Sequence, residues 1–131
     1  MGRAHIDIAN GVGRHLEPES FSIYAEPEIA ALPFWVAGEC FNPNCCALFE
    51  ADRPWQKYCC EGCARQDRRE HQKWSYKAGV ALLVHQMHSY PKTDAERALC
   101  NAARRYVRQV QSIWLTSRKT RCALARQARA V

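Results

Sequence analysis

The stretch CFNPNCCALFEADRPWQKYCCEGC, residues 40–63, decides the fold of this chain of 131 residues. It contains six of the eight cysteines, three near its front and three near its back. Large aliphatic side chains are few and are grouped only in the second half of the chain, so composition predicts a small core. A bound metal ion stabilises a chain of this kind, because metal binding and folding are coupled. We therefore expect residues 40–63 to fold around a metal.

The spacing of the cysteines predicts the ligands. Cys40 and Cys45 form a front pair, and Cys59 and Cys63 form a back pair beyond a loop. Two such pairs supply the four thiolates of a closed structural zinc site, so we predict one Zn²⁺ ion held by these four residues. Cys63 falls in the first turn of the following helix, whose N-terminal end stabilises a thiolate. Cys46 could replace Cys45, and the spacing leaves that alternative open.

The remaining cysteines are interpreted as small buried or half-buried thiols. They are Cys60, Cys100, Cys122 and whichever of the adjacent front cysteines is not a ligand. The N-terminus has no apolar run typical of a secretory signal, and no stretch approaches the length of a membrane span. We expect a cytoplasmic protein, in which thiols stay reduced and clustered cysteines bind metal more often than they form disulfides.

Part of the cysteine region resembles a known family. Cys45 is followed by three residues and then Phe49, and the sequence QKYC at 56–59 leads to Cys63 and a basic helix. This order is similar to treble-clef zinc fingers of the type common in small bacterial and phage DNA-binding proteins. The resemblance covers residues 39–77, and it implies a treble-clef knuckle around zinc. The chain departs from that family in its front pair, which has a spacer of four residues where two are usual, and in cysteines where Gly and Ser are common.

The fold class we predict is mainly α with a small zinc-bound knuckle. Short strands are expected in the N-terminal arm, at residues 5–9 (HIDIA) and 21–25 (FSIYA), because apolar and polar residues alternate there. A short helical turn is expected at residues 26–31. We divide the chain into an acidic arm at residues 1–36, the zinc finger with its basic helix at 37–77, a helical hairpin at 78–115 and a basic C-terminal helix or tail at 116–131.

Two long helices are predicted to follow the cysteines. The first begins near Gly62 and faces its neighbour with Trp74, Ala78, Ala81, His85 and His88. After a break at residues 89–92, Thr93 and Glu96 fit a capping box that opens the second helix. The short break predicts an antiparallel hairpin. The second helix is expected to pack through an apolar stripe at Ala95, Leu99, Ala102, Tyr106, Val110 and Ile113.

Charge divides the chain into two halves. Residues 1–60 carry four Lys or Arg against eight Asp or Glu, a net charge of −4, and residues 61–131 carry fifteen against five, a net charge of +10. A basic helical half behind a zinc knuckle indicates an anionic partner, with nucleic acid first. His71 and Gln72 are candidate base contacts. The candidate nucleic-acid-binding residues are Arg65, Arg68, Arg69, Lys73, Lys77, Arg104, Arg105, Arg108, Arg118, Lys119 and Arg121.

These features predict a zinc-dependent regulatory protein that binds nucleic acid, DNA before RNA, of phage or mobile-element type. The alternative is a protein-binding adaptor or inhibitor that uses the finger as a scaffold against RNA polymerase, a nuclease or a defence complex. Neither a membrane nor a small-molecule substrate is expected as a partner. No enzymatic activity is expected, because four thiolates close the zinc shell and leave no position for a reacting water.

Overall fold

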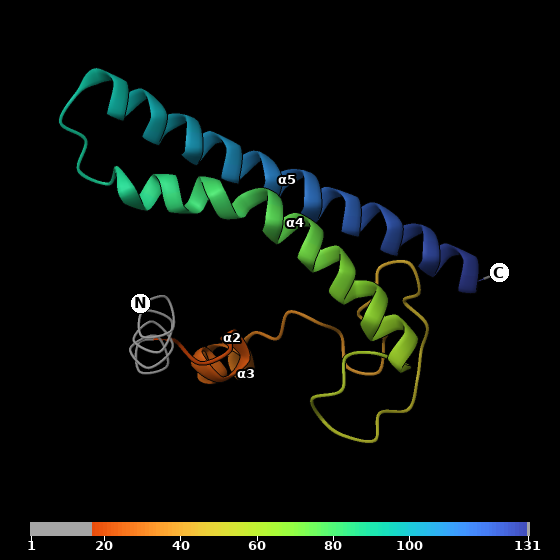
Figure 1. Cartoon of the computed structure of the whole chain (residues 1–131). Helices are drawn as coiled ribbons and strands as arrows, with labels where there is room; N and C mark the ends of the chain where they lie inside the picture. The colour runs from red at the N-terminus through yellow and green to blue at the C-terminus, as the bar shows by residue number, and fades with distance from the viewer. Residues whose placement is uncertain (1–16, 131) are drawn as a thin grey trace, which may run out of the picture. The chain divides into compact units, whose positions relative to one another are not determined.

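The computed structural model describes residues 17–130, and the chain divides into two compact units at residues 1–34 and 35–131. Each unit is described by itself. The described residues are mainly helical, as predicted. The helices are α2 (Phe21–Tyr24) and α3 (Glu26–Ala31) in the first unit, and α4 (Glu61–Met87) and α5 (Asp94–Ala130) in the second (Figure 1). No helix in this part of the chain is long and apolar enough to cross a membrane.

The expected strand at residues 21–25 is wrong, because this segment forms α2. The carbonyl oxygen of Ser20 accepts hydrogen bonds from the backbone N–H groups of Ile23 and Tyr24, at 3.0 and 2.9 Å, which closes a helical turn. Alternation over so few residues does not by itself separate a strand from a turn of helix. The expected helical turn at residues 26–31 is confirmed as α3. The expected strand at residues 5–9 lies outside the described residues.

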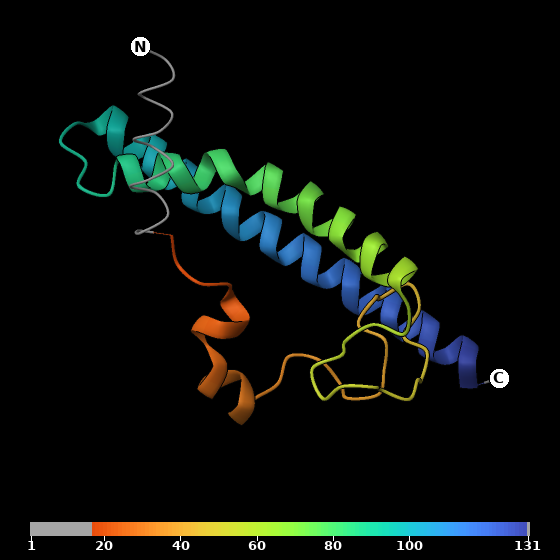
Figure 2. The ribbon, with the colours of Figure 1, turned by 60° about the horizontal axis from the view of Figure 1, so that its bottom comes forward.

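Helices α4 and α5 form the predicted hairpin and lie side by side along their length (Figures 1 and 2). The capping box at the start of α5 is confirmed. The backbone N–H of Glu96 donates to Thr93 Oγ1 at 3.1 Å, and the backbone N–H of Thr93 donates to Glu96 Oε2 at 3.2 Å. Helix α5 continues to Ala130, so residues 116–130 are helix rather than a separate tail.

The face of α5 that packs on α4 is rotated from the predicted stripe. Cys100, Ala103 and Val110 are the buried residues of α5, and of these only Val110 belongs to the predicted stripe. Leu99 and Ile113, which we expected in the core, are 48% and 49% exposed. Two neighbouring stripes of α5 satisfy the 3–4 spacing, and small residues bring the helix axes closer together than bulky ones do. A prediction from periodicity alone therefore placed the bulkier of the two stripes in the interface.

Nearer the cysteines, the indole rings of Trp74 and Trp114 stack across the interface with their centroids 6.2 Å apart. Trp74 is half-buried, as are Ala78, Ala81, His85 and His88 of the predicted α4 face. The predicted face of α4 is thus confirmed, in contrast to that of α5.

Loops containing most of the cysteines lie at the end of the hairpin where α4 begins (Figures 1 and 2). Their regular pairing within the described residues is one antiparallel bridge between Glu39 and Leu48. Cys40 N–H donates to the carbonyl of Ala47 at 2.8 Å, and Phe49 N–H donates to that of Gly38 at 2.9 Å. These bonds fold residues 38–49 back on themselves in a tight reversal.

Candidate metal centre and its helical support

Four cysteines converge at this end of the hairpin. The Sγ atoms of Cys40, Cys45, Cys59 and Cys63 all lie within 4.8 Å of one another, close enough to bind one metal ion. The Sγ of Cys59 is 3.9 Å from that of Cys45 and 3.7 Å from that of Cys63. The four residues are those predicted from the spacing, and the arrangement is consistent with a zinc finger. Cys45 rather than Cys46 completes the set, which answers the question that the sequence left open.

The front pair is positioned by the turn Asn42-Pro43-Asn44. The carbonyl of Asn42 accepts hydrogen bonds from the backbone N–H groups of Cys45 and Cys46, at 2.9 and 3.0 Å. The side chain of Asn42 is 2% exposed and accepts a hydrogen bond from the backbone N–H of Asn44 at 3.1 Å. Cys46 has φ 48°, in the left-handed region. This backbone turn aims the side chains of the adjacent cysteines in different directions.

The back pair joins the loops to α4. Cys63 lies in the first turn of α4, and the backbone N–H of Cys59 donates to the Sγ of Cys40 at 3.4 Å. Asn42 Nδ2 donates to Gln66 Oε1 at 2.6 Å, which ties the front turn to the same helix. Burial raises the pKa of the Cys59 and Cys63 thiols above the ordinary value. Metal binding at these sulfurs therefore displaces protons and weakens as the pH falls.

Cys46 and Cys122 are not isolated thiols. The structure joins them in a disulfide, with their Cα atoms 6.0 Å apart. This link connects the front turn to α5 across 76 residues of sequence, and no local pattern signals such a distant pair. Our interpretation of these two residues as separate small thiols is thus wrong. Cys100 is buried, as expected, whereas Cys60 is exposed.

An arginine of α5 contacts both the cysteine-containing loops and α4. One Nη atom of Arg118 lies 2.6 Å from Asp67 Oδ1 and 2.7 Å from Glu70 Oε2. The other donates to the carbonyl of Phe41 at 3.0 Å, and the guanidinium lies 4.6 Å from the centre of the Phe41 ring. The Arg118 side chain is 14% exposed and that of Asp67 is fully buried. Buried charges need such partners, because a lone charge away from water is costly.

The two carboxylates have further donors. The hydroxyl of Tyr58 donates to Asp67 Oδ2, and the pKa of Tyr58 is raised by its burial and by this contact. The indole N–H of Trp114 donates to Glu70 at 2.9 Å. Burial alone would raise the pKa of Glu70, but hydrogen bonds from Arg121, Trp114 and Arg118 outweigh it and hold that pKa at about 2. Asp67 and Glu70 therefore both have hydrogen-bond and ion-pair partners within the protein.

Three more arginines of α5 extend this contact toward the C-terminus. Arg121 lies 2.7 Å from Glu70 Oε1. Arg126 pairs with Glu39, next to the first cysteine ligand, through bonds of 3.0 and 2.5 Å. Arg129 lies 3.1 Å from Glu39 and also donates to the carbonyl of Cys46. The sequence analysis did not single out Arg126 and Arg129, because ion pairs across more than eighty residues leave no local pattern.

The candidate nucleic-acid-binding residues fall into three groups. Arg118 and Arg121 face the cysteine-containing loops and α4, in the ion pairs described above. Arg68 pairs with Glu61 at 3.0 Å on the surface. The ammonium of Lys73 lies over the ring of Trp74, and Arg104 lies 3.5 Å from His85. The others are exposed and make no ion pair with any residue in the range 17–130; they are Arg65, Arg69, Lys77, Arg105, Arg108 and Lys119.

The two candidate base contacts are placed differently. His71 lies 3.4 Å from Asp67, and its ring meets that of Trp114 edge-on at 5.0 Å. Gln72, the next residue, is exposed. His71 is therefore on the side of α4 that faces α5, and Gln72 is on the solvent side.

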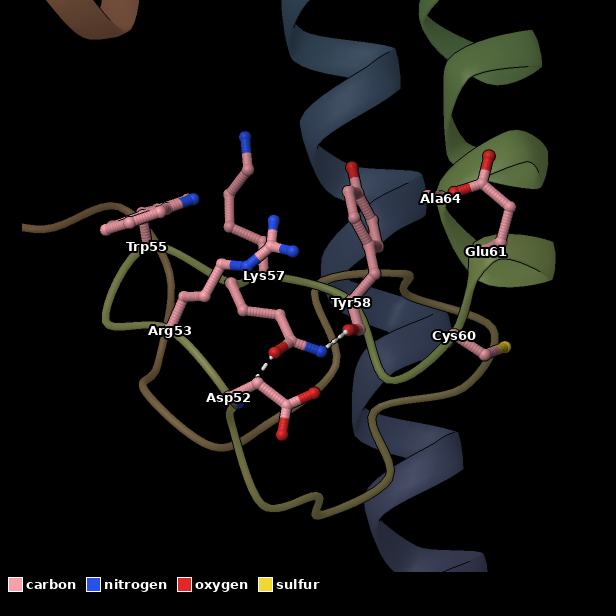
Figure 3. A pocket seen from close by; sticks show the side chains of 9 residues that line it. Asp52, Arg53, Trp55, Lys57, Tyr58, Cys60, Glu61 and Ala64 are labelled. Atoms are coloured by element: carbon pink, nitrogen blue, oxygen red, sulfur yellow. Dashed lines mark hydrogen bonds between the residues drawn. The ribbon is translucent and has the colours of Figure 1, made fainter.

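An open pocket of about 360 Å³ lies beside the back cysteines (Figure 3). Trp55, which is 65% exposed, lines it together with Arg53 and Lys57. Gln56 shapes the loop: its Oε1 accepts from the backbone N–H of Asp52 at 2.8 Å, and its Nε2 donates to the carbonyl of Tyr58 at 2.9 Å. This loop thus presents the Trp55 ring and the Arg53 side chain to solvent, whereas Lys57 is half-buried.

Comparison with known proteins identifies no relative: no family model, no curated protein and no solved structure matches the chain. The centre is therefore assigned from its own geometry. That geometry comprises four converging sulfurs, a tight turn at one pair, a helix start at the other and an arginine clamp from α5.

Proposed function

We propose that the protein is a zinc-dependent nucleic-acid-binding regulator with DNA as its target. The metal is assigned from the sulfur spacing. Four thiolates about 2.3 Å from a tetrahedral ion lie about 3.8 Å from one another. The distances of 3.7 and 3.9 Å from the Cys59 sulfur to its two neighbours agree with that value. These two distances support one Zn²⁺ ion bound by the four sulfurs.

The type of finger we propose is a treble clef. The order of ligands supports it, because the front pair lies on a tight turn and the last ligand, Cys63, lies in the first turn of a helix. Zinc in this position fixes the start of α4 relative to the loops, and it is structural because four thiolates leave no open position for chemistry.

The distribution of charge around α4 carries the nucleic-acid proposal. Asp67 and Glu70 lower the net positive charge of α4 when its residues are counted, but both are paired with arginines of α5. The outward side of the same turns bears Arg65 and Arg69, which are exposed and make no ion pair with the described residues. The exposed side of α4 is therefore more basic than its composition indicates.

The arrangement suits a helix that meets a phosphate backbone or a major groove. Arg65, Arg69 and Lys73 are spaced by four residues and so project from one side of α4. A major groove about 12 Å wide admits an α-helix, and arginines there contact phosphates and the edges of guanine. Arg104, Arg105 and Arg108 offer a second basic surface on α5.

The test is a fluorescence-anisotropy titration of the zinc-loaded protein with labelled random duplex DNA over a range of salt concentrations. We expect the logarithm of the binding constant to fall linearly with the logarithm of salt concentration, as phosphate contacts require. The double variant Arg65→Glu/Arg69→Glu should bind at least about tenfold more weakly, with a shallower salt slope. Arg97→Glu, at the far end of α5 beside Asp94, is the matched control and should bind as the wild type does.

Zinc content and helicity measured on each variant separate lost contacts from lost structure. If the double variant keeps its zinc and still binds DNA like the wild type, α4 is not the contact surface. Absence of DNA and RNA binding by the wild type at low salt would overturn the proposal.

One observation favours a second function, that of a protein-binding adaptor. Trp55 is 65% exposed on the finger and shares a pocket with Arg53 and Lys57. Tryptophan and arginine are enriched among the residues that dominate binding energy in protein interfaces. A partner such as RNA polymerase would then bind here with little dependence on salt, and Trp55→Ala would abolish that binding while leaving DNA affinity unchanged.

A further inference from the structure

The loop at residues 52–58 places an aromatic ring and two cations around one open pocket. The pocket has a volume of about 360 Å³, and Trp55, Arg53 and Lys57 line it (Figure 3). The Trp55 ring is 65% exposed, and Arg53 is exposed and makes no ion pair with any residue in the range 17–130. Tryptophan is highly buried on average. An exposed tryptophan that shares a pocket with cations is therefore a candidate binding surface.

The loop is held in one shape by its own hydrogen bonds. The side chain of Gln56 accepts from the backbone N–H of Asp52 at 2.8 Å and donates to the carbonyl of Tyr58 at 2.9 Å. Pro54 restricts the backbone immediately before Trp55. A ring carried by a loop of this kind loses little conformational freedom when a ligand binds, which favours binding.

Aromatic rings position Lys57 at the same pocket. Its Nζ atom lies 5.8 Å from the centre of the Trp35 ring, 5.7 Å from that of Phe41 and 6.0 Å from that of Tyr58. A cation within about 6 Å of a ring centre is attracted to the face of the ring. These contacts position a positive charge at the wall of the pocket that Trp55 lines.

The pocket also adjoins α4. Glu61 and Ala64, from the beginning of this helix, line it. Glu61 and Arg65 are four residues apart and are therefore neighbours on the helix surface. The carboxylate of Glu61 pairs with Arg68 at 3.0 Å, which offsets its negative charge, and that of Asp52 points away from the Trp55 ring in Figure 3. The pocket thus lies next to the side of α4 that we propose to contact phosphates.

The combination of ring and cations indicates the class of ligand. Proteins that bind single-stranded nucleic acid stack its bases on aromatic side chains and meet its phosphates with basic ones. A volume of about 360 Å³ is near the lower limit of about 300–1,000 Å³ for small-ligand pockets, so it suits one nucleotide. A protein partner would need an interface of about 800 Å² on each side. Bases within a duplex are paired and stacked on one another, so only an unpaired base can use the ring.

We propose that Trp55 is a stacking platform for an unpaired base, with Arg53 and Lys57 contacting the phosphates beside it. The target is then DNA in which a single-stranded segment adjoins a duplex. The duplex binds along Arg65 and Arg69 of α4, and the unpaired end enters the pocket. This inference rests on the proposed function for its duplex part. Since the Gln56 side chain is already bonded within the loop through its oxygen and its nitrogen, we expect little preference between bases.

The test compares the affinity of the zinc-loaded protein for a blunt duplex and for the same duplex with a short single-stranded overhang, by fluorescence anisotropy at one salt concentration. We expect the overhang to tighten binding about tenfold through stacking of a base. The same overhang built from abasic nucleotides should give little of this gain, because it offers phosphates without a ring.

Variants of Trp55 identify the platform. Trp55→Ala should bind both DNAs with the affinity of the wild type for the blunt duplex, and Trp55→Phe should keep part of the preference. Tyr90→Ala is the matched control, since it removes a 90%-exposed ring in the turn between α4 and α5, and it should keep the full preference. Because both rings are exposed, zinc content and helicity should be unchanged in every variant.

The outcomes separate this inference from the proposed function. Equal affinity of the wild type for both DNAs, or a preference that Trp55→Ala retains, would overturn the stacking site, while binding of the blunt duplex would still support contact by α4. A wild-type chain that binds the overhang DNA but not the blunt duplex, and loses that binding in Trp55→Ala, would support the stacking site and overturn the duplex function.

Discussion

Replacement of Arg118 by methionine should destabilise the protein more than any other single change of a charged residue in α5. The change removes the guanidinium but keeps a long apolar side chain against the Phe41 ring. It leaves the fully buried carboxylate of Asp67 and the 16%-exposed side chain of Glu70 without their shared cation. Removal of one partner of a buried ion pair costs about 3–5 kcal/mol, because the remaining charge stays buried. We expect a loss of free energy of unfolding in this range.

Urea unfolding of the zinc-saturated protein, followed by tryptophan fluorescence, measures this loss. Trp114 reports on the site directly, since its indole N–H donates to Glu70 at 2.9 Å. With a denaturant slope of about 2 kcal/mol per M, the midpoint should fall by about 1.5–2.5 M. Arg105→Met is the matched control: Arg105 is exposed and makes no ion pair with the described residues, so we expect a change below about 0.5 kcal/mol.

A double variant distinguishes an unpaired charge from a lost packing contact. Arg118→Met/Asp67→Asn removes the buried anion together with its cation and should recover a part of the lost stability. The reasoning is refuted if Arg118→Met lies within about 1 kcal/mol of the wild type, well below the expected cost of a stranded buried charge. It is also refuted if the second substitution only adds to the first.

Three further predictions concern other parts of the structure. Cys122→Ser should lower the free energy of unfolding by about 2–4 kcal/mol in oxidising buffer and by much less in a buffer with a reductant; urea titrations in the two buffers test this, and equal losses would refute the disulfide. Acid should weaken the arginine clamp: the pKa of Glu70 is about 2 against an ordinary value of 4.5, so its stabilising effect is present above about pH 4.5 and is lost as the pH falls toward 2. The stability difference between wild type and Glu70→Gln, about 1–2 kcal/mol near pH 7 after allowance for solvent screening, should therefore shrink across that window, and a constant difference would contradict the assignment. Thr93→Ala should cost about 1 kcal/mol in thermal or urea unfolding through loss of the helix cap, whereas Thr93→Ser should be nearly neutral, and equal costs would show that the hydroxyl is not what matters.

Local patterns predicted much of this molecule from sequence. The spacing of Cys40, Cys45, Cys59 and Cys63 identified the metal centre, because one ion needs two pairs of close ligands. The Thr93–Glu96 box marked the start of α5, because capping bonds join residues three apart. These features depend on neighbours in sequence.

Features that depend on distant residues were missed. The partners of Arg118 lie 48 to 77 residues away, so the sequence showed only a basic position and suggested a phosphate contact. Cys122 resembled any small helical residue until the fold brought it to Cys46. The stripe through Leu99 and Ile113 had the correct period but the wrong rotation, because periodicity does not say which of two apolar stripes meets the neighbouring helix.

Zinc content per chain tests the account most directly. Mass spectrometry with inductively coupled plasma, on protein quantified by amino-acid analysis, should find one zinc per wild-type chain. Cys45→Ser and Cys63→Ser should lose the metal, while Cys46→Ser and Cys60→Ser should keep it. A wild-type chain purified without zinc and unable to take it up, or a Cys46→Ser variant that loses zinc while Cys45→Ser retains it, would contradict the four-cysteine centre on which this fold is organised.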